Sequence, residues 1–410
     1  MSLTDIQDID KSDFYSYECL LTDEERDLLH AVRKFMTADV APLLLEHWSR
    51  ATFPVEIVPG MRQLGIAGLP YHGYGCGGGR YLLDGMIAME LARTDCSIAT
   101  FNGVHAGLSM GSIYLCGSDE QRERLLPAMA RYEKIGSFGL TEPEVGSGAS
   151  GGLQTTARRE GDTWILNGQK KWIGNATWGD LTVIWAKDVA DGRVKGFVVQ
   201  NSSPGFTVEK QMHKIALRIV QNGLITLDNV RVDESDRLQR ANSFKDTAEV
   251  LRVTRAGVAW MAVGCAMGAY ENALAYACSR EQFGRPIGGF QLVQDLLVRM
   301  LGNVTATYGL CVRLSQLQDE GHAEDRHSSL AKAFCTVRMR ETVGWARELL
   351  GGNGILLEHN VGRFVADAEA IYSYEGTRKM NTLIVGKAIT GLSAFVETAP
   401  LAQYDHSSPW

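Results

Sequence analysis

One acidic residue near the C-terminal end has the surroundings of a proton-accepting side chain. Glu375 follows Tyr374 and precedes Gly376, and the apolar Ile371 opens the same segment. Burial among aromatic and apolar neighbours disfavours the charged form of a carboxyl group and prepares it to take a proton. The glycine lets a ligand approach the backbone closely. Glu375 is therefore a candidate general base, although a glutamate that only ends a helix beneath a tyrosine has the same local sequence.

Three other segments carry groups that suit a large polar cofactor. Residues 136–147 are rich in glycine and contain Thr141 and Ser147, whose hydroxyls and neighbouring N–H groups can bind a polar aromatic ring. Trp172 closes an apolar run and can pack against a flat ligand. The planar guanidinium of Arg280 suits a diphosphate. Taken one by one, these segments are equally consistent with a loop, a core tryptophan and a surface arginine.

The elements that position these residues divide the chain into three zones. Residues up to about 135 have helical periodicity, with capping boxes that begin at Thr22 and Ser118. From about residue 243 long helical segments return, as expected for a helix bundle. One apolar stripe of this second helical zone consists of Leu292, Leu296, Met300 and Val304.

Between the helical zones, residues 136–240 have β-strand character. Apolar runs alternate with turn residues, and the spacing suits a small antiparallel barrel or sandwich. Asn167-Gly168 stands between two such runs and predicts a hairpin turn. The order helical, β, helical is unusual for one chain.

Composition limits the classes of function. The 410 residues are too many for one ordinary core, and a net charge of −7 argues against a broad nucleic-acid surface. The eight cysteines form no CxxC pair and indicate buried thiols in a reducing compartment. The nine histidines have no HExxH-like spacing, so we expect no metal site.

The two ends of the chain predict its location. The N-terminus is polar and acidic without an apolar h-region, so we expect no signal peptide. No apolar run is long enough to span a bilayer, and the final Ser408-Pro409-Trp410 is not a peroxisomal signal. We therefore expect a cytoplasmic protein without membrane insertion.

These motifs together resemble the acyl-CoA dehydrogenase and oxidase superfamily, closest to its glutaryl-CoA dehydrogenase and short-chain acyl-CoA oxidase branch. The resemblance covers nearly the whole chain. It implies an α+β fold, mostly α, with an N-terminal helical domain (1–135), a middle antiparallel β-barrel domain (136–242) and a C-terminal four-helix bundle (243–410). It also implies FAD as cofactor, an acyl-CoA substrate, a role in fatty acid β-oxidation and a homotetramer built as a dimer of dimers.

The resemblance also implies roles for individual residues. Glu375 would be the catalytic base, and Ser147, Arg255 and Gly376 would bind the acyl-CoA. Arg280 and Gln291, with Phe283 nearby, would reach the FAD of a neighbouring subunit. The residues expected to bind FAD are Phe138, Leu140, Thr141, Ser147, Trp172, Ile173, Gly174, Arg280, Phe283, Gln291, Glu348, Gly351, Gly352, Thr377, Arg378 and Lys379.

The chain departs from the superfamily pattern at several positions. Gly148 replaces an aspartate, and Gly174 replaces the threonine that dehydrogenases often direct at flavin N5. Ala92 and Ala99 stand where glutaryl-CoA dehydrogenase has a glutamate and a carboxylate-binding arginine. A buried carboxylate facing two alanines would be unpaired and costly. These alanines therefore predict a plain acyl chain.

We accordingly predict an FAD-dependent acyl-CoA dehydrogenase that forms a trans-2-enoyl-CoA from a short or medium acyl chain. Its electrons would pass to electron-transfer flavoprotein. An acyl-CoA oxidase that uses O₂ is the first alternative, with which Gly174 is compatible. Glutaryl-CoA dehydrogenase is disfavoured by the alanines. A flavin- or CoA-binding protein without catalysis is disfavoured by the intact motifs, and a DNA-associated member of the fold by the acidic charge balance.

Overall fold

The computed structural model describes residues 11–394 of the chain. The predicted features of the first five residues and of the last three lie outside this range. The N-terminal part is helical, as expected. Its helices are α1 (Asp23–Phe35), α2 (Leu44–Arg50), α3 (Val58–Leu64), α4 (Tyr81–Thr94), α5 (Cys96–Asn102), the π-helical η6 (Gly103–Met110), α6 (Gly111–Cys116) and α7 (Asp119–Ala130).

Both predicted capping boxes are confirmed. The hydroxyl of Thr22 accepts a hydrogen bond from the N–H of Glu25 at the start of α1, and the Glu25 side chain accepts one from the N–H of Thr22. Ser118 and Gln121 repeat this exchange at the start of α7. Each box satisfies backbone donors that have no partner within the helix.

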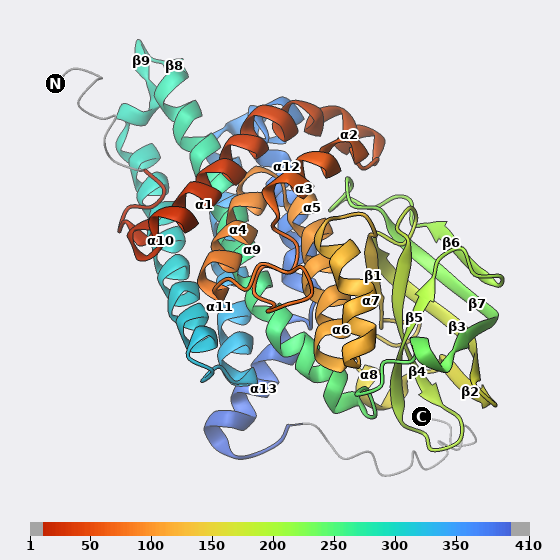
Figure 1. Ribbon diagram of the computed structural model, residues 1–410. Coiled ribbons are helices and arrows are strands. Elements are labelled where there is room, and N and C mark those ends of the chain that lie inside the picture. Colours follow the sequence, from red (N-terminus) through yellow and green to blue (C-terminus); the bar gives the residue numbers. More distant parts are fainter. Residues whose placement is uncertain (1–10, 395–410) are drawn as a thin grey trace, which may run out of the picture.

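The middle part is a seven-stranded sheet that lies along one side of the helices (Figure 1). The strands are β1 (Gly136–Gly139), β2 (Thr156–Glu160), β3 (Thr163–Gly174), β4 (Leu181–Asp188), β5 (Val194–Gln200), β6 (Phe206–Lys210) and β7 (Asn222–Asp233), with the short helix α8 (Ala149–Gly152) after β1. The order is β1-β4-β2-β3-β7-β6, and β5 pairs with β4. The expectation of a purely antiparallel sheet was wrong, because β4 pairs in parallel with both β1 and β2.

The predicted hairpin at Asn167-Gly168 is also wrong. β3 runs through both residues, and a shift in its pairing with β7 between Leu166 and Gly168 marks a bulge. Gly168 has φ +143°, and a Cβ there would lie 2.7 Å from the Cα of Thr155. The glycine therefore serves a close backbone approach inside a strand. The tight turn lies instead between β2 and β3, where Glu160 pairs with Thr163.

The C-terminal part is a helix bundle. It consists of α9 (Phe244–Ser279), α10 (Gln291–Asp319), α11 (Asp325–Leu349), α12 (Val361–Ser373) and α13 (Arg378–Thr390), with the 3-10 helix η9 (Gly351–Ile355) after α11. The short strands β8 (Glu281–Gln282) and β9 (Arg285–Pro286) project from one end of the bundle, and α13 lies at the other end (Figure 1).

α9 is the central helix of the molecule and packs closely against α4. A Cβ at Gly264 would lie 2.1 Å from the carbonyl oxygen of Met89, and a Cβ at Gly268 would lie 2.1 Å from that of Arg93. By length and composition α9 could cross a membrane, and among the described residues it alone meets that criterion. However, 67% of its apolar window is buried inside the protein, as in a core helix.

The predicted stripe of α10 is buried only in part. Met300 and Val304 belong to the core, whereas Leu292, nearer to the β8–β9 hairpin, is 83% exposed. The first two turns of α10 thus present apolar side chains on the surface of a single chain.

Candidate active site

Glu375 lies in the short turn that joins α12 to α13. It has φ +53°, and Gly376 follows with φ +80°. These two consecutive left-handed residues form the turn between the helices, and for a residue with a Cβ this conformation is strained. Glu375 is half-buried. Its Oε2 lies 3.2 Å from the hydroxyl of Thr254 on α9, which donates a hydrogen bond to it.

Opposing influences act on the protonation of Glu375. Burial raises the pKa of its carboxyl group above the ordinary value. The positive charge of Arg255, the Thr254 hydroxyl and the positive charge of Lys332 each lower the pKa, without cancelling the effect of burial. The net result is a carboxylate that is more basic than one in water.

Two side chains hold the backbone of this turn. The Lys332 ammonium, on α11, donates to the carbonyl oxygens of Tyr372 at 3.1 Å and of Gly376 at 2.7 Å. The buried Asn381 donates from Nδ2 to the carbonyl oxygens of Gly376 at 2.9 Å and Thr377 at 3.1 Å. Every one of these acceptors lies within three residues of Glu375, so the position of Glu375 is set by α11 and α13.

The glycine-rich segment after β1 folds around a buried ion pair. Lys170 of β3 is wholly buried, and its ammonium lies 2.9 Å from Oε1 of Glu142 and 3.0 Å from the carbonyl oxygen of Leu140. The Glu142 carboxylate also accepts the N–H groups of Gln154 at 2.7 Å and Thr155 at 2.9 Å. One buried carboxylate therefore fixes both ends of the loop.

The residues predicted to line the flavin ring lie on or next to this loop. Phe138 and Leu140 are buried, Thr141 is half-buried and Ser147 is exposed. Trp172 has φ +67° and is 55% exposed, so its indole is open to a ligand.

The helical segment η6 lies between the end of β3 and the turn that carries Glu375. A Cβ at Gly174 would lie 3.3 Å from Cγ2 of Val104 in η6. One turn further along η6, a Cβ at Gly107 would lie 3.4 Å from Cγ2 of Thr254. Thr254 in turn bonds Glu375. The end of β3, which includes the buried Ile173, and the carboxylate thus lie on two sides of one helical segment.

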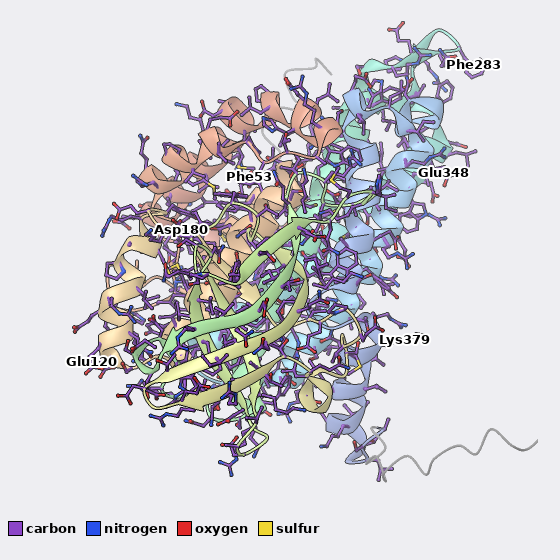
Figure 2. All side chains as sticks on the ribbon, turned by 90° about the vertical axis from the view of Figure 1, so that its right-hand side faces the viewer. Phe53, Glu120, Asp180, Phe283, Glu348 and Lys379 are labelled. Atoms are coloured by element: carbon purple, nitrogen blue, oxygen red, sulfur yellow. The ribbon has the colours of Figure 1, made fainter. Side chains whose placement is uncertain are left out.

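The structure separates the other predicted FAD residues into two groups (Figure 2). Phe283 and Glu348 lie toward one end of the bundle, and Lys379 lies toward the other. The group near the β8–β9 hairpin consists of Arg280, Phe283, Gln291, Glu348, Gly351 and Gly352, all of them exposed. The group beside Glu375 consists of Thr377, Arg378 and Lys379. Within a single chain the first group is not brought to Glu375.

The residues predicted to bind the acyl-CoA are distributed differently. Gly376 follows Glu375 directly, and Ser147 lies on the glycine-rich segment after β1. Arg255 forms an ion pair with Asp325 at the start of α11, and its charge lowers the pKa of Glu375. Arg255 is therefore electrostatically coupled to the base.

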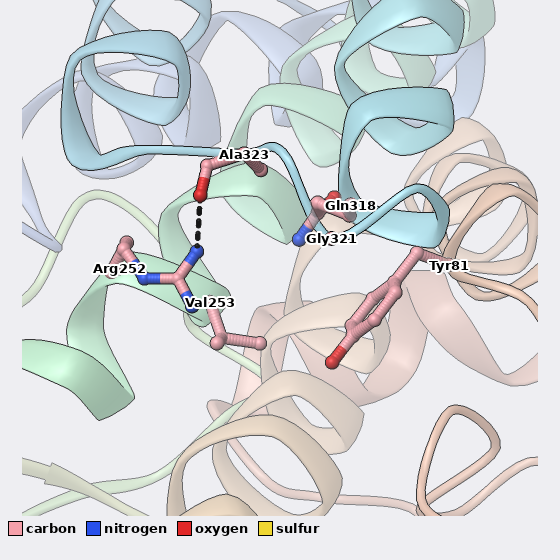
Figure 3. Close-up of a pocket in the computed structure, with 6 residues that line it drawn as sticks. All are labelled: Tyr81, Arg252, Val253, Gln318, Gly321 and Ala323. Atoms are coloured by element: carbon pink, nitrogen blue, oxygen red, sulfur yellow. Dashed lines mark hydrogen bonds between the residues drawn. The ribbon is translucent and has the colours of Figure 1, made fainter.

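Two small cavities lie near the part of α9 that carries Thr254. The first, of about 70 Å³, is lined by Tyr81, Arg252, Val253, Gln318, Gly321 and Ala323 (Figure 3). In it Arg252 donates to the carbonyl oxygen of Ala323 at 3.0 Å. The second, of about 50 Å³, shares some of these residues and includes Thr254. Neither cavity contains a residue of the predicted FAD set.

The residues around β1 and β3 fit a flavin. The hydroxyl of Ser137 and Oδ1 of Asn175 are buried without a hydrogen-bond partner among the described residues. Such groups are costly unless a ligand or water satisfies them. Within residues 11–394, no atom lies within 4 Å of a Cβ position at Gly146 or Gly148, so the loop has an open face. An exposed indole, free polar atoms and an open backbone are what a planar polar ring requires.

Three family models match the chain in succession. The N-terminal domain of acyl-CoA dehydrogenase matches residues 22–133, the middle domain residues 137–230 and the C-terminal domain residues 244–390. The chain belongs to the acyl-CoA dehydrogenase family.

Individual relatives agree with this assignment. A structure of glutaryl-CoA dehydrogenase from Mycobacterium smegmatis in complex with FADH2 matches with a TM-score of 0.91 and 35% identity, covering 94% of this chain and 99% of that one. Butyryl-CoA dehydrogenase from Megasphaera elsdenii matches with a TM-score of 0.86 and 30% identity over 90% and 98%. The 3-(aryl)acrylate reductase of Clostridium sporogenes is 33% identical over 88% of this chain and 97% of its own length.

The protein is therefore an FAD-dependent oxidoreductase that acts on a CH–CH group. Bound FAD would accept the hydride that leaves the substrate. The three-part architecture predicted from the sequence is confirmed. Among the described residues no group of histidine, cysteine, aspartate and glutamate side chains could hold a metal ion.

Sequence reasoning missed several residues of the site. Thr254, Lys332 and the pair Lys170–Glu142 were not identified, although each contacts a predicted segment. For Lys332 a signal exists, because a single lysine interrupts the apolar run Leu330-Ala331-Lys332-Ala333-Phe334. A buried lysine needs a partner, but local sequence does not reveal which one.

Proposed function

We propose that this protein catalyses the α,β-dehydrogenation of an acyl-CoA thioester, with Glu375 as the base that removes the α-proton. The observation that carries this proposal is the setting of the Glu375 carboxylate. It is half-buried, its pKa is raised by burial, and it accepts a hydrogen bond of 3.2 Å from Thr254. A carboxylate in such a setting is more basic than one in water, which suits removal of a weakly acidic proton.

Each neighbouring group would have a defined part in the proton transfer. Thr254 and Arg255 would stabilise the ionised carboxylate before the reaction and orient it. The N–H of Glu375 would donate to the thioester carbonyl, where negative charge develops as the proton leaves. Arg255 and Ser147 would hold the CoA part of the substrate, and the glycine at 376 would let it pass close to the backbone.

Small residues where η6 packs against α9 support a short or medium acyl chain. Gly103 and Gly107 face α9, where a Cβ at Gly103 would lie 4.0 Å from Sδ of Met261. The hydroxyl of Tyr374 lies 3.7 Å from the same sulfur. We propose that a short acyl chain would lie along these glycines, and that the side chains of Met261 and Tyr374 would limit its length.

The surroundings of Ala92 and Ala99 support a substrate without a second carboxylate. Both alanines are buried, and α4 packs closely against α9 at this level. The nearby cation Arg93 is paired with Glu90 and Glu271, and Arg363 is paired with Asp95. Each of these arginines already has a carboxylate partner.

A comparison of substrates tests this point directly. We expect butyryl-CoA to be oxidised and glutaryl-CoA to be neither oxidised nor decarboxylated at a comparable rate. Comparable rates with the two thioesters would overturn the substrate assignment and restore the glutaryl-CoA dehydrogenase alternative.

We further propose that the electrons pass to electron-transfer flavoprotein. Gly174 supports a second candidate function, an acyl-CoA oxidase, because the residue leaves only backbone at the strand end that faces Val104. Anaerobic mixing of the purified yellow protein with butyryl-CoA, followed by admission of air with peroxide detection, separates the two. Bleaching that persists in air indicates a dehydrogenase, and rapid recolouring with stoichiometric peroxide indicates an oxidase.

We also propose that the protein is a cytoplasmic homotetramer, and exposed apolar residues near the β8–β9 hairpin support the assembly. Phe283 is 93% exposed, Leu292 83% and Val298 69%. Large apolar side chains gathered at one end of a chain are typical of a contact between copies. Such a contact would also carry Arg280 and Gln291 to the FAD of a partner. Sedimentation of the purified protein tests the assembly, and a monomer that retains full activity would contradict it.

A further inference from the structure

The turn that carries Glu375 contains strain that its own residues do not compensate. Glu375 has φ +53° and Gly376 has φ +80°. A left-handed residue with a Cβ persists only where the surrounding structure holds it. The carboxyl end of α12 also leaves carbonyl oxygens without helical partners. Whatever satisfies those oxygens therefore determines where Glu375 lies.

Lys332 supplies this support from a different helix. Its side chain is 0% exposed, and its ammonium bridges the carbonyl oxygen of Tyr372, at 3.1 Å, and that of Gly376, at 2.7 Å. One acceptor precedes Glu375 by three residues and the other follows it by one. The ammonium thus connects the last turn of α12 to the start of α13, with Glu375 in the segment between the two bonds.

Two charged side chains of the described residues act on Lys332. Glu375 faces it from the turn and Arg255 faces it from α9, while Asp325 at the start of α11 pairs with Arg255. Burial lowers the pKa of Lys332 to about 8, although the charge of Glu375 opposes that shift. In return the charge of Lys332 lowers the pKa of Glu375. At neutral pH most Lys332 side chains are therefore cationic.

We propose that Lys332 is a positioning residue for the reaction: its ammonium holds the backbone on both sides of Glu375 and keeps the carboxylate ionised and aimed. It does not touch the substrate. This inference rests on the proposed role of Glu375 as base. It adds that the base works only while a buried cation on α11 retains its proton.

The experiment compares the pH dependence of anaerobic bleaching by butyryl-CoA in the FAD-loaded parent protein, Lys332→Met and Lys332→Arg. In Lys332→Met we expect bleaching slower by about 10- to 100-fold, because two charge-assisted hydrogen bonds are lost. The fall in its bleaching rate at low pH (the acid limb of the profile) should move to higher pH, since removal of the cation raises the pKa of Glu375. In Lys332→Arg the cation does not titrate, so the acid limb should stay in place. The fall in rate near pH 8 that we expect in the parent should be absent from both variants.

A matched control removes another shielded lysine. Lys195 of β5 donates to Asp191 at 3.0 Å and is remote from α11, so Lys195→Met should keep the parent pH profile. FAD content and thermal unfolding of every variant show whether it is folded. If Lys332→Met fails to retain FAD, the pH dependence of bleaching in Lys332→Arg still tests the proposed role of Lys332.

The possible failures are distinguishable. Profiles of both Lys332 variants that superimpose on the parent profile would overturn the inference while leaving Glu375 as base. A fall near pH 8 that persists in both variants would assign that limb to another group and also overturn it. If Glu375→Gln bleaches at the parent rate, the proposed function itself is wrong, whatever the Lys332 variants do.

Discussion

The hydroxyl of Thr254 and Oε2 of Glu375 lie 3.2 Å apart, although 121 residues separate them in the sequence. The first belongs to the central helix α9 and the second to the turn between α12 and α13. The same threonine contacts η6 through its methyl group, opposite Gly107. Thr254 therefore lies between the proposed base and η6, the helical segment that also faces Gly174 at the end of β3.

Glu375→Gln should retain FAD and lose substrate-driven bleaching. The amide keeps the size of the side chain but cannot accept the α-proton, and general base catalysis typically contributes at least about 100-fold. Anaerobic stopped-flow spectroscopy with butyryl-CoA measures the rate. Glu375→Asp serves as control, because it keeps a carboxylate and should retain a measurable rate.

Thr254→Val should raise the pKa of Glu375. The Thr254 hydroxyl now stabilises the ionised carboxylate, so its removal favours the protonated form. The pH below which bleaching slows should therefore move upward. Thr254→Ser keeps the hydroxyl and should restore the limb. An unchanged limb in the valine variant would contradict the role of this hydrogen bond.

Lys170→Met should weaken both the fold and the retention of FAD. It leaves the buried carboxylate of Glu142 without its cation, and breaking a buried ion pair on one side costs about 3–5 kcal/mol. Denaturant unfolding and the FAD-to-protein absorbance ratio measure the two effects. The double variant with Glu142→Gln should be more stable than Lys170→Met, since it no longer buries an unpaired charge. Additive losses would argue against direct coupling of the pair.

His105 should make the fold sensitive to acid. Its Nδ1 accepts the N–H of Gly136 at 3.0 Å and its Nε2 donates to the carbonyl oxygen of Met129, also at 3.0 Å, so the folded protein holds it neutral. Burial lowers its pKa to about 4. Between about pH 6.5 and 4 the unfolded chain binds a proton at His105 that the native state does not bind. The free energy of unfolding should therefore fall as pH decreases from about 6.5 to 4, by about 3 kcal/mol in total.

The measurement for His105 is the free energy of unfolding of the FAD-loaded protein at pH 7.5 and at pH 5. His105→Gln keeps one acceptor and one donor but does not titrate, so this component of the pH dependence should be missing from the variant. The same acid loss in both proteins would assign the effect to other groups.

Gly174→Thr should slow any reaction of the reduced protein with oxygen. The new side chain would extend toward Val104, because a Cβ at position 174 would lie 3.3 Å from Cγ2 of Val104. It would also add a hydroxyl at the end of β3. The rate of recolouring after admission of air measures the effect. Gly174→Ala separates bulk from hydroxyl, and recolouring in the threonine variant as fast as in the parent would remove Gly174 from the choice between acceptors.

Local sequence was sufficient for the elements whose determinants lie within a few residues. The capping boxes at Thr22 and Ser118 predicted the starts of α1 and α7, because their hydrogen bonds join residues three apart. The change from helical to β and back to helical periodicity, with the motif around Glu375, predicted the three-part architecture, the family and the cofactor.

Tertiary structure alone decided the relationships between distant segments. Asn167-Gly168 has the local preference of a turn, yet pairing with β7 and contact with Thr155 keep it inside β3. Thr254 and Lys332 meet the Glu375 turn only because α9, α11 and α12 pack together. The local sequence of a segment does not indicate which distant segment it will hydrogen-bond. The composition of each segment records its burial and its conformational preference, but the partner it meets depends on how all the helices and strands pack.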